Sequence, residues 1–189
     1  MKVIFLDIDG VLNSQLWYSK RRNFNTDYVD EHYPFYEFDP DAIICLNRII
    51  KETGAKLIIS STWRKNRTIE ELQELLNSVG VVGEVIDKTP ILSLYEQNEY
   101  KGNAKRGNEI DYLLKNTGKF QRINWCKDTQ QEHIDKAIIK NYIILDDDSD
   151  MLYSQREHFI QTTIETGLDN KIADKAIEIL NKTLIELYY

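Results

Sequence analysis

The sequence contains few cysteines and no long hydrophobic run. Cys45 and Cys126 are the two cysteines among 189 residues, and neither has a neighbour at the spacing of a zinc ligand set. We therefore expect two reduced thiols. No run approaches the ~20 apolar residues of a membrane span, and the apolar run Val3 to Leu6 is shorter than the roughly 7–15 residues of a secretory signal. These absences predict a cytoplasmic protein with no membrane segment.

The composition is that of a folded, acidic protein. Hydrophobic residues make up 42% of the chain, and the formal net charge is -7. An acidic chain argues against wholesale binding of nucleic acid, which needs a basic surface, but it is compatible with a local basic site. The length is typical of one domain, which we expect to span residues 1–189.

Short apolar runs predict the strands of a parallel sheet. The runs Val3 to Leu6, Leu57 to Ile59 and Tyr142 to Leu145 are rich in β-branched residues and continuous rather than alternating. That pattern is typical of strands buried on both faces, as in a parallel sheet. Weaker strand signals occur at 84–86 and 159–162.

Capping residues and apolar periodicity predict helices between these strands. Asp39 followed by Pro40 is typical of a helix start, and Gly54 marks its end. Thr68 and Glu71 form a capping-box pattern. Further helices are expected at 108–115, 129–139 and 170–187. The alternation of strands and helices predicts an α/β fold, a three-layer Rossmann-like sandwich around a central parallel sheet.

Two stretches are less regular. Residues 14–38 hold eight aromatic residues and the basic triplet Lys20-Arg21-Arg22. These side chains either stack bases and hold a nucleic-acid backbone or pack a loop onto the core, and we favour packing. Residues 118–141 are expected to form an insertion between a helix and the next strand.

Oxygen-bearing side chains follow all three strong strands. The first strand is followed by Asp7 and Asp9, the second by Ser60 and Ser61, and the third by the run DDDSD from residue 146. The carboxyl ends of parallel strands meet at one edge of a sheet. Converging carboxylates there favour a hard divalent cation such as Mg²⁺. The alternative is that these acidic residues only cap helices or solvate loops. We favour a metal site made from Asp7, Asp9 and either Asp146 or Asp147.

Four motifs in order resemble those of the haloacid dehalogenase (HAD) superfamily. The strings are FLDIDGVLN at 5–13, SSTWR at 60–64, RGNEI at 106–110 and ILDDDSD at 144–150. Their combination is most similar to the HAD domain of "Swiss Army Knife" RNA repair proteins. The resemblance covers nearly the whole chain and implies a Mg²⁺-dependent phosphatase with a HAD-like fold.

The resemblance assigns roles to the first motif and to the metal ligands. It implies that Asp7 attacks phosphorus to form an aspartyl-phosphate and that Asp9 protonates the leaving oxygen and later deprotonates water. Gly10 allows the chain to turn sharply at the phosphate. Mg²⁺ would be held by the Asp7 carboxylate, the Asp9 backbone carbonyl and an acid of the last motif. That acid is Asp146 or Asp147, and we favour Asp147.

The resemblance leaves other assignments open by one position. The hydroxyl of the second motif is that of Ser60 or Ser61, and we favour Ser60 because it directly follows the strand. The cation of the third motif is Lys105 or Arg106, and the subgroup points to Arg106, which can bind phosphate through two hydrogen bonds.

Two further residues are candidates for substrate binding. Arg64 either reaches a substrate phosphate or lies on the surface, and Asn13 either lines the pocket or only turns the chain.

The superfamily selects substrates with cap insertions, and here these are short. Residues 14–38 and 83–105 are each too short for a cap domain, so we expect a minimal cap and an open site. An open site suits a nucleotide or nucleic-acid terminal phosphate. The alternatives are a small-metabolite phosphatase with the same core and a non-catalytic module that binds phosphate or nucleic acid.

Overall fold

The strands form one parallel sheet. A computed structural model describes residues 1–23, 38–92, 105–116 and 139–182, and all statements below concern these residues. The strand order is β3-β2-β1-β4-β5, and every neighbouring pair is parallel. The strands are β1 (Lys2–Leu6), β2 (Lys56–Ile59), β3 (Val85–Lys88), β4 (Asn141–Asp146) and β5 (Phe159–Gln161). The predicted α/β class with a central parallel sheet is confirmed.

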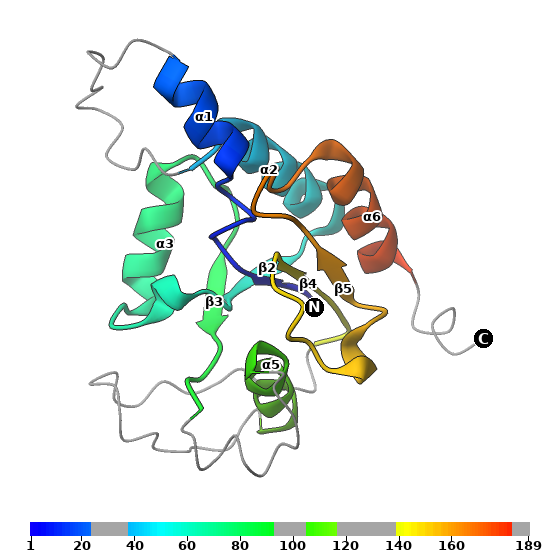
Figure 1. Cartoon of the computed structure of the whole chain (residues 1–189). Helices are drawn as coiled ribbons and strands as arrows, with labels where there is room; N and C mark the ends of the chain where they lie inside the picture. The colour runs from blue at the N-terminus through cyan, green and yellow to red at the C-terminus, as the bar shows by residue number, and fades with distance from the viewer. Residues whose placement is uncertain (24–37, 93–104, 117–138, 183–189) are drawn as a thin grey trace.

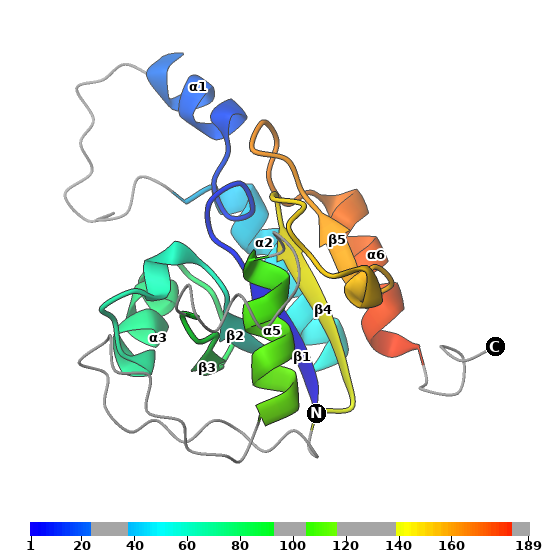
Figure 2. The same cartoon turned by 60° about the horizontal axis from the view of Figure 1, so that its bottom comes forward.

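Helices cover both faces of this sheet (Figure 1). The helices of the described residues are α1 (Gln15–Asn23), α2 (Pro40–Thr53), α3 (Ile69–Ser78), α5 (Lys105–Asn116) and α6 (Asn170–Asn181), with short 3-10 turns η1 (Thr62–Arg64) and η3 (Tyr153–Gln155). Ile4 and Leu6 of β1 pack into a core with α2, α3 and α6. Val3 and Phe5 pack with Ile110 and Leu113 of α5 on the other side, and Figure 2 shows α5 on that side of the sheet. The continuous apolar run of β1 is thus buried on both faces.

The capping residues predicted from the sequence form their hydrogen bonds at the expected helix ends. The Asp39 carboxylate accepts the Asp41 N–H at 2.9 Å, and Gly54 ends α2 in the left-handed conformation. Both hydrogen bonds of the Thr68–Glu71 capping box are formed. Helix α5 begins at Lys105 rather than at the expected residue 108, which brings the third motif into its first turn.

Several predictions fall on residues that are not described. The expected helix at 129–139 and most of the expected insertion at 118–141 lie outside the described residues. The expected cap-like segment 14–38 begins with α1, but residues 24–37 are also outside them. Helix α6 ends at Asn181, because Lys182 follows it in an extended conformation, so the helix does not continue to residue 187 as predicted.

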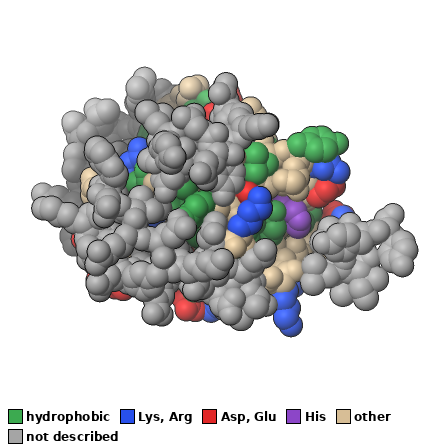
Figure 3. All heavy atoms as spheres, turned by 90° about the horizontal axis from the view of Figure 1, so that it is seen from below, with side chains coloured by type: hydrophobic (Ala, Val, Ile, Leu, Met, Phe, Trp, Pro, Cys, Tyr) green, Lys and Arg blue, Asp and Glu red, His purple; other side chains and the backbone are tan. Residues whose placement is uncertain are grey.

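The described surface shows two further features. None of the helices in the described ranges is long and apolar enough to cross a membrane. Among the described residues, Figure 3 shows charged side chains of both signs on the face seen from below.

Candidate active site

Asp7 lies at the first position after β1 and is almost completely buried. Its backbone N–H donates to the carbonyl of Leu145 on β4 at 3.0 Å, and its Oδ1 accepts the N–H of Ile8 at 2.7 Å. Burial raises the pKa of the Asp7 carboxyl above its ordinary value, while the positive charge of Arg106 and a hydrogen bond from the Ser61 side chain oppose that rise. Asp7 is therefore held through its backbone by β4 and through its carboxylate by Ile8, Ser61 and Arg106.

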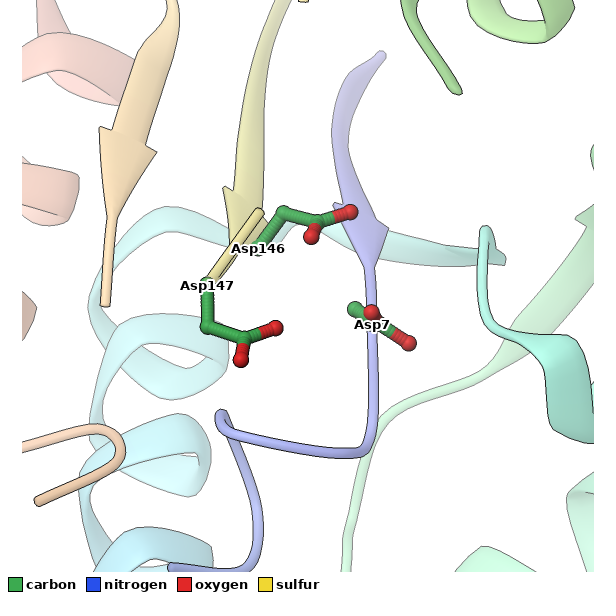
Figure 4. A group of neighbouring side chains, drawn as sticks. All are labelled: Asp7, Asp146 and Asp147. Atoms are coloured by element: carbon green, nitrogen blue, oxygen red, sulfur yellow. The ribbon is translucent and has the colours of Figure 1, made fainter. Parts of the chain in front are cut away.

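Asp7 forms an acidic cluster with Asp146 and Asp147, whose ligand oxygens all lie within 4.8 Å of one another. Figure 4 shows the latter two carboxylates pointing from the end of β4 toward the chain that carries Asp7. Burial, and next the charge of Asp7, raise the pKa of Asp146 to about 8. The same two causes raise the pKa of Asp147.

This acidic cluster fits a divalent metal ion. Three carboxylates at this separation repel one another when ionised, and a cation relieves that repulsion. One oxygen of Asp146, Oδ2, is buried and accepts no hydrogen bond from the described residues. Oxygen-only ligands suit a hard cation. Both Asp146 and Asp147 belong to the cluster, so their positions do not decide which of the two carboxylates is the metal ligand. The Asp9 carboxylate is not a member.

Arg106 faces the acidic cluster from the first turn of α5. Its Nη2 lies 3.5 Å from Asp7 Oδ2 and its Nε lies 3.7 Å from Asp146 Oδ2. The remaining nitrogen, Nη1, is buried without a hydrogen-bond partner among the described residues. Lys105 is exposed instead. The start of the helix is anchored by Asp150, whose Oδ2 accepts the Arg106 backbone N–H at 2.9 Å.

Asp9 is held apart from the acidic cluster by two donors. The Trp63 indole Nε1–H donates to Asp9 Oδ2 at 3.0 Å, and the Asn13 amide donates to Oδ1 at 2.9 Å. The side-chain oxygen of Asn13, Oδ1, accepts the Gly10 N–H at 2.8 Å. Asn13 therefore braces the turn and also orients Asp9. Sequence reasoning gave Trp63 no role, although it stands inside the SSTWR string; its ring packs edge-on against Phe38 at 5.5 Å.

The two serines after β2 have different surroundings. Ser61 bonds to the Asp7 carboxylate and also accepts the N–H of Trp63 at 3.3 Å. Ser60 is fully buried, and its hydroxyl has no partner among the described residues. The contact with Asp7 does not support the preference for Ser60.

Arg64 is buried and bound by other protein groups, whereas the sequence left open either a substrate phosphate or a surface position. Its Nε and Nη2 donate to the carbonyls of Thr89 and Pro90 at 2.8 and 3.2 Å, and its Nη1 donates to the carbonyl of Ser61 at 2.7 Å. Nη2 also pairs with Glu109 of α5 at 2.6 Å, and each side chain is only 3% exposed. Because all three guanidinium nitrogens are bound to the protein, Arg64 is a buried structural link. Sequence reasoning also gave Glu109 no role, although it stands in the third motif.

Together these observations define a Rossmann-like α/β domain with an acidic metal-type centre at the carboxyl edge of its sheet. A family model described as the HAD domain in Swiss Army Knife RNA repair proteins matches residues 3–173, and the chain belongs to this family. Membership points to a phosphatase-type hydrolase, and the acidic cluster fits a HAD metal site. No curated protein and no solved structure gives a significant match.

Proposed function

We propose that the protein is a Mg²⁺-dependent phosphomonoesterase in which Asp7 is the nucleophile. The observation that carries the proposal is the position of Asp7 between the carboxylates of Asp146 and Asp147 and the guanidinium of Arg106. A phosphoryl group at this point would meet a nucleophile, a cation and a metal site within one small volume. Family membership supports the same reaction class.

The residues of the site have complementary roles in this reaction. The Asp7 oxygen forms a bond to phosphorus, and the bond from phosphorus to the leaving oxygen breaks. Asp9 gives its proton to the leaving oxygen. Water then attacks the aspartyl-phosphate, transfers a proton to Asp9 and releases Asp7 and inorganic phosphate. Arg106 holds the phosphoryl oxygens through the edge that includes Nη1, which has no hydrogen-bond partner among the described residues.

We assign the hydroxyl of the second motif to Ser61 because its side chain contacts Asp7. Mg²⁺ would be held by Asp7, by Asp146 or Asp147, and by the backbone carbonyl of Asp9. When bound, it neutralises charge that develops on the transferring group.

For the substrate, we propose a nucleotide or a nucleic-acid terminal phosphate. The support is the description of the family, which names RNA repair proteins, together with the short segments available for a cap. We retain a single domain over 1–189 with a minimal cap as part of the proposal. A small-metabolite phosphatase is the alternative that shares this catalytic core.

The test is phosphate release with and without Mg²⁺ from an aryl phosphate, mononucleotides, sugar phosphates and oligonucleotides bearing 5′- or 3′-phosphates. We expect Mg²⁺-dependent turnover that is lost in Asp7→Asn. Asp148→Asn is the matched control, because Asp148 is an exposed aspartate in the same loop as the metal ligands. Turnover retained in Asp7→Asn would contradict the covalent mechanism. Oligonucleotide binding without any turnover would favour a binding module.

A further inference from the structure

Both oxygens of the Asp9 carboxylate accept a hydrogen bond from a side-chain N–H group. Oδ2 accepts the indole N–H of Trp63 at 3.0 Å, and Oδ1 accepts the amide of Asn13 at 2.9 Å. An indole N–H can only donate, and so can the amide nitrogen. The amide cannot turn over to present its oxygen, because that oxygen already accepts the Gly10 N–H at 2.8 Å. Asp9 is thus held by two groups that cannot take a proton from it.

Trp63 is itself held firmly. Its ring meets Phe38 edge-on at 5.5 Å, and the guanidinium of Arg67 lies 5.6 Å from the ring centroid. Arg67 also donates from Nη1 to the Trp63 carbonyl at 2.8 Å. The indole N–H therefore has a fixed direction, and Asp9 takes its orientation from it across 54 residues of sequence.

We infer that Trp63 is a positioning residue that directs the proton of Asp9 to the leaving group. This inference rests on the proposed function. As Asp7 bonds to phosphorus and the bond to the leaving oxygen breaks, that oxygen takes the Asp9 proton together with the electron pair of the broken bond. Since Trp63 and Asn13 each hold one oxygen of Asp9, the carboxyl group keeps a single orientation while it transfers the proton. In the second half-reaction the same fixed carboxylate accepts a proton from water.

The role predicts that the effect of a variant depends on the leaving group. Trp63→Phe keeps an aromatic ring against Phe38 but removes the N–H. With an alkyl phosphate, whose alkoxide must be protonated to leave, we expect kcat to fall about tenfold, part of the roughly 10²–10⁴-fold that general acid catalysis contributes. With 4-nitrophenyl phosphate, whose phenolate leaves without a proton, kcat should change less than about twofold, because the acid contributes little to that step. KM should change little for either substrate.

Lys65→Met is the matched control, because Lys65 is an exposed residue two positions after Trp63 and its substitution leaves the indole N–H and its supports in place. Its effect should be equal for the two substrates. Equal losses for both substrates in Trp63→Phe, or no loss for either, would overturn the role of Trp63 and leave the phosphatase intact. Wild-type protein that releases phosphate from neither substrate would overturn the proposed function and the role of Trp63 with it. The thermal midpoint of each variant is recorded to compare their folding.

Discussion

The carboxylate of Asp147 occupies the space that a side chain on Gly10 would need. A Cβ built on Gly10 would lie 2.7 Å from the Cβ of Asp147, and still closer to the atoms of its carboxylate. Gly10 also has a φ of +68°, which favours glycine. The turn after the proposed nucleophile and the last carboxylate of the acidic cluster are therefore in direct contact. A glycine is required at this point for two separate reasons, a backbone conformation and a close approach.

These two reasons can be separated by experiment. Gly54 has the same φ of +68°, but a Cβ added to it would meet no atom within 4 Å, so Gly54→Ala should cost only the left-handed strain of about 1–2 kcal/mol. Gly10→Ala should cost more than Gly54→Ala and should also displace Asp147. Urea unfolding of the two variants measures the difference, and Mg²⁺ titration measures the displacement. Equal losses of stability with unchanged Mg²⁺ affinity would contradict the close contact.

Local signals account for why the fold was predictable. The Thr68–Glu71 box and the Asp39–Pro40 helix start act within a few residues of sequence, and both form as expected. The apolar run of β1 is long enough to indicate burial on both faces, and it is paired on both edges. Helix α5 begins earlier than its apolar periodicity suggests, because its first turn faces the acidic cluster and is therefore polar.

The site was less predictable, because side-chain direction at a strand end depends on distant partners. The contact of Asp7 with Ser61 rather than Ser60 is decided by one position in a turn. The pairing of Arg64 with Glu109 spans 45 residues, and neither periodicity nor spacing signals it. The acidic residues were easier to predict, since the carboxyl ends of neighbouring parallel strands must converge.

Arg106 and Lys105 differ in their surroundings, and we predict different effects on removal. Arg106 is buried against Asp7 and Asp146, whereas Lys105 is exposed. Arg106→Ala should lower kcat by about 10²–10³-fold, which is typical of losing one group that stabilises the transferring charge. Lys105→Ala should lower it by a few-fold at most. Steady-state kinetics on the best substrate of the panel measures both values of kcat. A larger loss in Lys105→Ala than in Arg106→Ala would assign the cation of the third motif to Lys105.

The raised pKa of Asp146 predicts how stability depends on pH and on Mg²⁺. Burial and Asp7 raise this pKa from 3.8 to about 8, so the folded state binds the proton more tightly than the unfolded state does. The stabilisation is fully present below pH 3.8 and is lost as pH rises toward about 8. In EDTA, the Asp146 carboxyl group should therefore make the thermal midpoint fall as pH rises from 3.8 toward about 8. Asp146→Asn should remove this part of the pH dependence.

Mg²⁺ should reverse this loss, because a bound cation favours the ionised carboxylates. The increase in thermal midpoint on adding Mg²⁺ should be larger at pH 8 than at pH 5 in wild-type protein, and smaller in Asp146→Asn at both. Scanning fluorimetry of both proteins at pH 5 and pH 8, each in EDTA and in Mg²⁺, measures these increases. An equal increase at the two pH values would show that Mg²⁺ binding is not linked to these carboxyl groups.

Arg64 should matter more for stability than Arg48, which is only partly buried. Arg64→Met leaves the Glu109 charge buried and removes donors from three carbonyls, so we expect a loss of about 3–5 kcal/mol in the free energy of unfolding. Arg48→Met breaks an ion pair with Asp174 whose side chains are 35% and 69% exposed, together with a hydrogen bond to the Asn170 carbonyl at 3.0 Å, and it should cost about 1–2 kcal/mol.

The double variant Arg64→Met/Glu109→Met tests where the stabilisation by Arg64 originates. Replacing a buried ion pair with apolar side chains is often close to neutral, so a pair that acted alone would recover most of the loss. Here the carbonyls of Ser61, Thr89 and Pro90 would still lack their donor, and unsatisfied buried groups cost about 1–3 kcal/mol each. We therefore expect urea unfolding to show that the double variant recovers only part of the stability lost in Arg64→Met. Full recovery would show that Arg64 stabilises the fold only by balancing the charge of Glu109.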